Sequence, residues 1–242
     1  MLAFRAVSKV YDGSTVVQPL DLEIGAGEVA VLLGPSGCGK TTILRMVAGL
    51  VAPTTGEITV DTLTLKPDTL AQVRRKLGYV IQEGGLFPHL TALGNVTLMA
   101  RHDGWPRDRV HTRLDELAEI TQFPRDALTR YPSELSGGQR QRLSLMRALF
   151  LSPSILLMDE PLGALDPLIR AGLQRDLKQI FERTGATVLL VTHDLVEAAR
   201  FADRVFVMYG GRIVQQGALA DIMSRPANEF VADFLSAQVV SP

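Results

Sequence analysis

The stretch Gly34-Pro35-Ser36-Gly37-Cys38-Gly39-Lys40-Thr41-Thr42 constrains the fold more than any other part of the chain. The apolar run Val29–Leu33 before it has the length of one buried strand, and residues 43–50 after it have the apolar spacing of a packed helix. A strand, a glycine-rich loop ending in Lys-Thr and a helix form the P-loop pattern. The sequence therefore predicts a site for a nucleoside triphosphate.

The chemistry of this loop follows from its residue types. Glycines let backbone N–H groups turn inward around phosphate oxygens, and the N-terminus of the following helix favours an anion. We expect Lys40 to reach the β- and γ-phosphates, and the hydroxyl of Thr41 to ligate Mg²⁺.

Composition sets the broad class. The 242 residues are 46% hydrophobic and 21% charged with a net charge of −1, which suits one large globular domain, or a domain with a subdomain, and does not suggest a binder of nucleic acid. No apolar stretch approaches the ~18 residues of a membrane span, and the first residues lack a signal-peptide layout. We expect a cytosolic chain whose membrane role, if any, comes through a partner.

Cys38 is the single cysteine, so no internal disulfide can form and a reducing compartment is indicated. Two interpretations of its thiol are open. A position near a helix N-terminus would lower the pKa of the thiol and make it reactive. We favour the alternative, in which Cys38 is a small residue filling a variable position of the loop.

Polar side chains follow three further expected strands. Gln82 follows 77–81 and either caps that strand or reaches Mg²⁺ or the attacking water. Asp159 and Glu160 follow 155–158, and we expect Asp159 to hold Mg²⁺ and Glu160 to polarise the water as general base. His193 follows 187–191 and is either structural or a hydrogen-bonding partner of the γ-phosphate or the water.

The remaining elements come from periodicity and turn residues. We expect a helical insertion within 91–131. Tyr11, beside the Asp12-Gly13 turn, is by periodicity alone a half-buried strand aromatic. The other expected strands are 2–7, 15–17, 20–24, 57–60 and a hairpin of 205–209 and 212–216, and the other expected helices are 70–76, 168–183, 195–201 and 219–235.

A glycine-rich segment begins the helix that starts near residue 136. Ser136 is a good N-cap, which explains the serine but not Gly137, Gly138 and Gln139, because glycine is a poor helix former. Such a bare helix start lets a phosphate approach the backbone closely.

Taken together, these motifs resemble the nucleotide-binding subunit of an ABC transporter over essentially the whole chain. Residues 34–42 look like its Walker A loop, 155–160 its Walker B strand and 135–139 its Leu-Ser-Gly-Gly-Gln signature; Gln82, 163–166 and His193 fall at its Q-loop, D-loop and switch histidine. The resemblance implies an α/β fold: a P-loop NTPase, RecA-like core with an N-terminal antiparallel β-subdomain and an inserted α-helical subdomain at about 88–150, within one nucleotide-binding domain over 1–242.

The resemblance also implies ATP and Mg²⁺ as ligands and a role for each site residue. Tyr11 would stack on adenine, and Gln82 and His193 would join Glu160 in catalysis. Gln82 would also join Thr41 and Asp159 at the metal. The residues expected to contact the nucleotide are Tyr11, Gly34, Pro35, Ser36, Gly37, Cys38, Gly39, Lys40, Thr41, Thr42, Ser136, Gly137, Gly138, Gln139 and Asp166.

Two subunits of this family associate head to tail and sandwich two ATP molecules. Each ATP would lie between the P-loop of one copy and residues 136–139 of the other, and hydrolysis at Glu160 would release the dimer. The helical subdomain and the Gln82 loop would transmit the change to an integral membrane permease docked near residues 83–89. This places the chain on the inner face of the cell membrane, with a solute-binding protein as a further expected partner.

Within the family, residues 82–89 and 160–167 look most like bacterial importers of quaternary amines and other osmoprotectants such as glycine betaine, choline and proline. Many such subunits continue into a pair of regulatory domains, and we expect none within residues 1–242. The alternatives are a subunit of another small-solute importer, for amino acids or polyamines, or of an exporter. A non-transport ABC ATPase acting on DNA or ribosomes, or a P-loop kinase, fits the residues less well.

Overall fold

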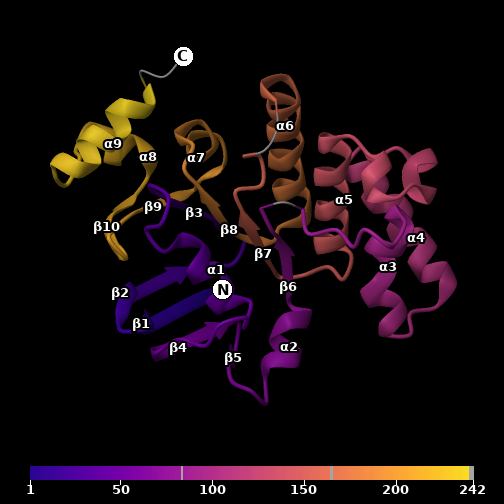
Figure 1. Ribbon diagram of the computed structural model, residues 1–242, viewed down its shortest axis with the longest axis horizontal. Helices are drawn as coiled ribbons and strands as arrows, with labels where there is room; N and C mark the ends of the chain where they lie inside the picture. Colours follow the sequence, from indigo (N-terminus) through magenta and orange to yellow (C-terminus); the bar gives the residue numbers. More distant parts are fainter. Residues whose placement is uncertain (83, 164–165, 240–242) are drawn as a thin grey trace.

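Two β-sheets and the helices around them make up the computed structural model, which describes residues 1–82, 84–163 and 166–239 (Figure 1). The larger sheet has the order β10-β9-β3-β8-β7-β6, and the smaller has the order β2-β1-β4-β5. The strands of the larger sheet are β3 (Val29–Leu33), β6 (Leu77–Val80), β7 (Ile155–Asp159), β8 (Thr187–Thr192), β9 (Arg204–Tyr209) and β10 (Arg212–Gly217). The strands of the smaller sheet are β1 (Leu2–Tyr11), β2 (Ser14–Ile24), β4 (Thr55–Val60) and β5 (Leu63–Thr64).

Helices cover both faces of the larger sheet. Their bounds are α1 (Lys40–Val47), α2 (Leu70–Arg75), α3 (Ala92–His102), α4 (Arg107–Ile120), α5 (Gly137–Leu149), α6 (Pro167–Thr184), α7 (Leu195–Phe201), α8 (Leu219–Ser224) and α9 (Glu229–Val239), with 3₁₀ turns at Arg125–Thr129 and Pro132–Glu134. None of the helices in the described part of the chain is both long and apolar enough to cross a membrane.

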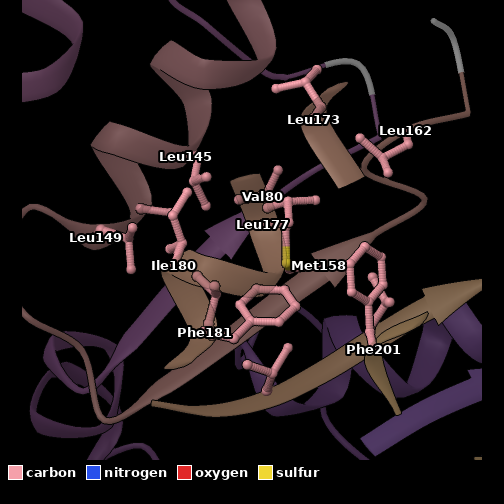
Figure 2. Packing of buried hydrophobic residues seen from close by; sticks show 14 of the residues in the cluster. Val80, Leu145, Leu149, Met158, Leu162, Leu173, Leu177, Ile180, Phe181 and Phe201 are labelled. Atoms are coloured by element: carbon pink, nitrogen blue, oxygen red, sulfur yellow. The ribbon is translucent and has the colours of Figure 1, made fainter. Parts of the chain in front are cut away.

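Alternating residues of the central strands divide the core into two layers. Ala30 and Leu32 face α1 and the smaller sheet, whereas Val31 and Leu33 face α5, α6 and α7. Figure 2 shows part of the second layer, in which residues of α5 and α6 such as Leu145 and Leu177 pack over the strands. A sheet buried on both faces explains why its strands read as continuous apolar runs.

Parallel pairing brings the expected site residues to one edge. β3, β8, β7 and β6 are consecutive neighbours and run parallel, with Leu33 opposite Thr192 and Asp159 opposite Val191. The segments that follow these four strands therefore leave the sheet at the same edge, where open α/β sheets bind ligands.

Most expected elements are confirmed, with several corrected bounds. Residues 15–17 and 20–24 belong to one strand, β2, because it is an edge strand and tolerates Pro19 within it. The helix expected at 43–50 is α1, which begins at Lys40 and ends at Val47, since the left-handed Gly49 follows its C-cap. The helix expected at 219–235 is two helices, broken around Pro226.

The expected N-terminal antiparallel sheet is confirmed in β1, β2, β4 and β5, and the expected helical insertion is confirmed in α3 and α4. The strand expected at 77–81 ends at Val80. The division of the chain into a core and a subdomain at about 88–150 stays a prediction.

Candidate functional site

The loop between β3 and α1 is shaped by its glycines. A Cβ on Gly34 would lie 2.4 Å from the carbonyl oxygen of Met208, so the loop leaves the sheet in a space that admits no side chain. Gly37 and Gly39 have φ of +79° and +106°, a backbone region that favours glycine. The sequence therefore folds here into a tight loop with exposed backbone at Ser36 and Gly37.

Lys40 lies at the centre of this loop. Its side chain is buried, and Nζ donates to the carbonyl oxygens of Gly34 and Pro35 at 2.7 and 2.9 Å. Within the described part of the chain, no carboxylate lies within ion-pair distance of Nζ. Because burying an ammonium group without a counter-ion is costly, the loop fits an anionic ligand.

The N-terminus of α1 offers a second feature that suits an anion. Gly39 is its N-cap, so no side-chain oxygen caps the helix, and its first turn has no acidic residue. The free N–H groups and the positive end of the helix dipole favour phosphate. Together with Lys40, this cradle fits a nucleoside triphosphate.

The thiol of Cys38 is buried within the loop. Its side chain is buried, with Sγ 3.8 Å from Lys40 Nζ, and burial raises the pKa of the thiol despite the nearby ammonium. The alternative of a lowered pKa is therefore wrong, and Cys38 fills space in the loop, as favoured from the sequence.

Thr41 and Asp159 come together as oxygen donors. Oγ1 of Thr41 donates to Oδ1 of Asp159 at 3.0 Å, and Asp159 is buried at the end of β7. Burial raises the pKa of the Asp159 carboxyl, partly offset by the hydrogen bond from Thr41. No group of three His, Cys, Asp or Glu side chains among the described residues is arranged as a metal site. The pair fits Mg²⁺, which prefers oxygen ligands and commonly shares them between one or two carboxylates and substrate phosphates.

Glu160 lies between the two side chains whose roles the sequence left open. Gln82 Nε2 donates to Oε2 of Glu160 at 3.2 Å, and His193 Nδ1 lies 3.3 Å from Oε1. Glu160 has φ of +43°, a strained value for a residue with a side chain, while its N–H continues the sheet by donating to Val191 O. The carboxylate of Glu160 thus lies between Gln82 and His193 and contacts both.

Tyr11 and Asp166 lie at the periphery of the described site. Tyr11 is 38% exposed next to the hairpin turn between β1 and β2, with Lys9 Nζ 4.8 Å above its ring. Asp166 is the N-cap of α6 and accepts from the N–H of Ile169 at 3.1 Å, a structural role that we did not expect. Residues 164 and 165, the middle of the expected D-loop, lie outside the described residues.

The glycine-rich start of α5 has a local explanation for part of its sequence. Ser136 Oγ accepts from the Gln139 N–H, and Gln139 Oε1 accepts from the Ser136 N–H, which is a capping box. A Cβ on Gly138 would lie 2.9 Å from Ile169 of α6. The prediction that capping does not explain Gln139 is therefore wrong. The capping box does not explain why residue 137 is a glycine.

Within one chain, the start of α5 does not meet the P-loop. α1 packs on one face of the larger sheet and α5 on the other, and they lie well apart (Figure 1). The structure thus gathers Lys40, Thr41, Asp159, Glu160 and neighbouring strand ends but leaves residues 136–139 elsewhere.

Two features of the site were not expected from the sequence. Ser144 Oγ and Arg147 Nη2 of α5 both donate to the carbonyl oxygen of Gly84, which anchors the loop after Gln82. Glu197 of α7 is buried beside His193. The available signal was that Glu197 lies four residues before the apolar Phe201 and three residues after the capping Asp194, a spacing that places its carboxyl on the buried face of the helix.

Comparisons with known proteins agree with this geometry. The family model described as ABC transporter matches residues 17–163. The chain is 44% identical over 236 residues to the glycine betaine/carnitine/choline transport ATP-binding protein OpuCA of Bacillus subtilis, covering 97% of this chain and 62% of that protein. It is 41% identical to the glycine betaine uptake system ATP-binding protein YehX of Escherichia coli, covering 97% of this chain and 76% of that protein.

A third relative carries a different name, the sn-glycerol-3-phosphate import ATP-binding protein UgpC of Pectobacterium atrosepticum, at 42% identity over 99% of this chain and 67% of that protein. The chain spans about three fifths of the length of the first curated relatives that it matches. Among solved structures, the dimeric post-hydrolysis ATP-binding cassette MJ0796 bound to ADP and Pi matches with a TM-score of 0.82 and 33% identity, covering 90% of this chain and 99% of that chain.

The cradle predicts the effect of removing Lys40. In Lys40→Ala, we expect the Kd for ATP to rise about 10- to 100-fold, because hydrogen bonds to charged groups contribute about 1.5–3 kcal/mol. Isothermal titration calorimetry measures this change. Lys66→Ala, which removes an exposed lysine after β5, serves as the control and should bind ATP like the wild type. Equal ATP affinity in Lys40→Ala would refute the assignment of the loop.

Proposed function

This chain belongs to the ABC transporter family, and we propose that it is the ATP-binding and ATP-hydrolysing subunit of an importer for osmoprotectants of the quaternary-amine class. The observation that carries the proposal is the buried Lys40, which has no ion pair within the described residues, at the same sheet edge as the Thr41–Asp159 pair and Glu160. These groups supply a phosphate cradle, metal ligands and a base in one place.

The residues of this edge divide the work of hydrolysis. Lys40 and the N-terminus of α1 hold the β- and γ-phosphates and lower the cost of negative charge in the transition state. Thr41 and Asp159, together with Gln82, would hold Mg²⁺, which when bound neutralises charge on the phosphate oxygens. Tyr11 would stack on the adenine ring from the hairpin that packs over the loop at Gly39.

Glu160 is the general base. Its carboxylate accepts the hydrogen of the attacking water, and its contacts with Gln82 and His193 fix where its two oxygens point. Gln82 and His193 therefore both act on Glu160. Each of the two also lies at a strand end from which it would reach the γ-phosphate. Positioning of this kind accounts for a large part of phosphoryl-transfer catalysis.

A second copy of the chain completes the site. Residues 136–139 lie away from the P-loop of their own chain, and the N-terminus of α5 presents backbone N–H groups suited to a phosphate. Two copies arranged head to tail bring this helix start, with Asp166 nearby, to the γ-phosphate held by the other copy. The solved relative MJ0796 is described as dimeric, which supports this arrangement.

A groove beside β6 and α3 suits a permease segment. Its volume is about 600 Å³, and Ile81, Phe87, Leu98 and Met99 are exposed apolar residues along it. Such a cluster of exposed apolar side chains marks an interaction surface. The occupant that we propose is a short cytoplasmic helix of the membrane permease, which places the chain at the inner face of the membrane. Residue 83, at the start of the expected docking segment, lies outside the described residues.

The groove is connected to both halves of the ATP site. The loop after Gln82 is fixed to α5 through Ser144 and Arg147, and Ser136 caps the start of α5. A movement of α5 on dimer closure therefore carries the groove with it, which is how ATP binding would reach the permease.

The solute is chosen by the permease and by a solute-binding protein rather than by this chain. The relatives named for glycine betaine and choline support an osmoprotectant, and the relative named for sn-glycerol-3-phosphate, at 42% identity, supports a second candidate. A subunit of that second importer would have the same ATP site.

Uptake measurements in cells of the native host test which solute is transported. After deletion of the gene, we expect the accumulation of radiolabelled glycine betaine at high osmolarity to fall, and the wild-type chain but not Lys40→Ala to restore it. Loss of sn-glycerol-3-phosphate uptake with unchanged glycine betaine uptake would transfer the proposal to the second candidate.

The groove predicts a separation of hydrolysis from coupling. In Met99→Glu, we expect ATP hydrolysis by the isolated chain to stay within about twofold of wild type, and co-purification with the permease to be lost, because a charge would be buried in an apolar contact. Met223→Glu on α8 is the matched control, since Met223 and Met99 are 48% and 47% exposed. Normal permease binding by Met99→Glu would argue against docking in this groove.

A further inference from the structure

A buried glutamate lies behind His193 without a role in the proposed hydrolysis. Glu197 is 3% exposed on the inner face of α7, and its Oε2 has no hydrogen-bond partner in the part of the chain that the structure describes. Carboxylates are rarely buried unless they are paired, so this side chain calls for an explanation.

Glu197 is connected to the turn that carries His193. The Asp194 N–H donates to Thr192 Oγ1 at 3.0 Å, which leaves the hydroxyl hydrogen of Thr192 free to donate to the Glu197 carboxyl, since both residues line the same small cavity. The side chain of Asp194 in turn caps α7 by accepting from the N–H of Val196 at 2.7 Å. Thr192 and Asp194 flank His193, so this network fixes its backbone on both sides.

A small cavity joins Glu197 to the base. Its volume is about 20 Å³, room for a single water, and its lining includes Glu160, Thr192, His193 and Glu197. His193 Nδ1 in turn contacts Glu160 at 3.3 Å. The carboxyl of Glu197 is thus two contacts away from the atom that takes the proton from water.

The charges around Glu197 do not outweigh the cost of burying it as an anion. The neighbouring groups are Asp194 at the start of α7, Arg170 on α6, His193 on the turn and Glu160 across the cavity. Arg170 already lies 3.8 Å from Asp194. Burial raises the pKa of the Glu197 carboxyl to about 7, an effect that Thr192, Arg170 and His193 only partly offset.

We propose that Glu197 is a positioning residue for hydrolysis, whose neutral carboxyl, acting through Thr192, holds His193 against Glu160. The proposal rests on the proposed function, since it assigns the base to Glu160. Ionisation strengthens the hydrogen bond from Thr192, but it leaves a charge on the unpartnered Oε2. That charge must draw in water or repel Glu160 and Asp194, and this repulsion loosens the turn. Because the group is neutral below pH 7 and charged above it, support for His193 falls as pH rises through 7.

Four variants test this. Glu197→Gln keeps the hydrogen bond to Thr192 and cannot ionise. Glu197→Leu and Thr192→Val both break the hydrogen bond while keeping the volume. Glu182→Gln, at an exposed position of α6, is the matched control. Each is assayed as the full chain with Mg-ATP between pH 6 and pH 8.5.

We expect Glu197→Gln to keep wild-type kcat at pH 6 and to lose less activity than wild type as pH rises, whereas Glu182→Gln follows wild type. In Glu197→Leu and Thr192→Val, kcat should fall about tenfold or more, because small misplacements of positioned groups are costly, with KM changed less than about twofold. The double variant Glu197→Leu/Thr192→Val should be no slower than either of its single variants, because both act on the same hydrogen bond. Wild-type kcat in folded Glu197→Leu, or a Glu197→Gln pH profile identical to wild type, would overturn the proposal.

Histidine NMR gives a readout that does not depend on hydrolysis. The chain has four histidines, so the ring resonances of His193 can be assigned by one substitution. We expect them to shift in Glu197→Leu and Thr192→Val and to stay in place in Glu197→Gln at pH 6. A wild-type chain that hydrolyses no ATP would refute the proposed function, while unmoved His193 resonances in the first two variants would refute the role of Glu197.

Discussion

Parallel pairing of β3, β8, β7 and β6 is the constraint on which the rest of the structure depends. β3, β7 and β8 are buried on both faces, so a shift of one residue would exchange the side chains that face α1 for those that face α5 and α6. The same pairing sets Leu33 opposite Thr192 and Asp159 opposite Val191, one residue earlier on β8. The phosphate loop, the histidine turn and the acidic pair are therefore placed by core packing rather than by contacts between loops.

Helix α5 extends this order beyond the sheet edge. Its first residues form a capping box, its middle packs in the core, and Ser144 and Arg147 hold the loop that follows Gln82. One rigid helix thus connects the surface proposed to meet a second copy with the groove proposed to receive the permease. In this account, ATP does mechanical work because binding at one end of α5 moves the other.

Much of the site could be predicted from the sequence because short apolar runs followed by polar residues mark strand ends. Contacts between side chains could not, since strand order does not say where Gln82 and His193 point, and both meet Glu160. The capping role of Asp166 and the burial of Glu197 also escaped prediction, because each depends on the packing of α6 and α7. The continuity of β2 through Pro19 also escaped prediction, since it depends on β2 being an edge strand.

The central claim is that the sheet edge forms half of an ATP site and that residues 136–139 of a second copy form the other half. Sedimentation velocity with Mg-ATP tests it most directly in Glu160→Gln, where slowed hydrolysis preserves the ATP-bound state. We predict a dimer for Glu160→Gln and a monomer when Ser136→Arg is added, with each chain of the double variant still binding ATP. A monomeric Glu160→Gln with bound ATP, or a dimer that survives Ser136→Arg, would contradict the account.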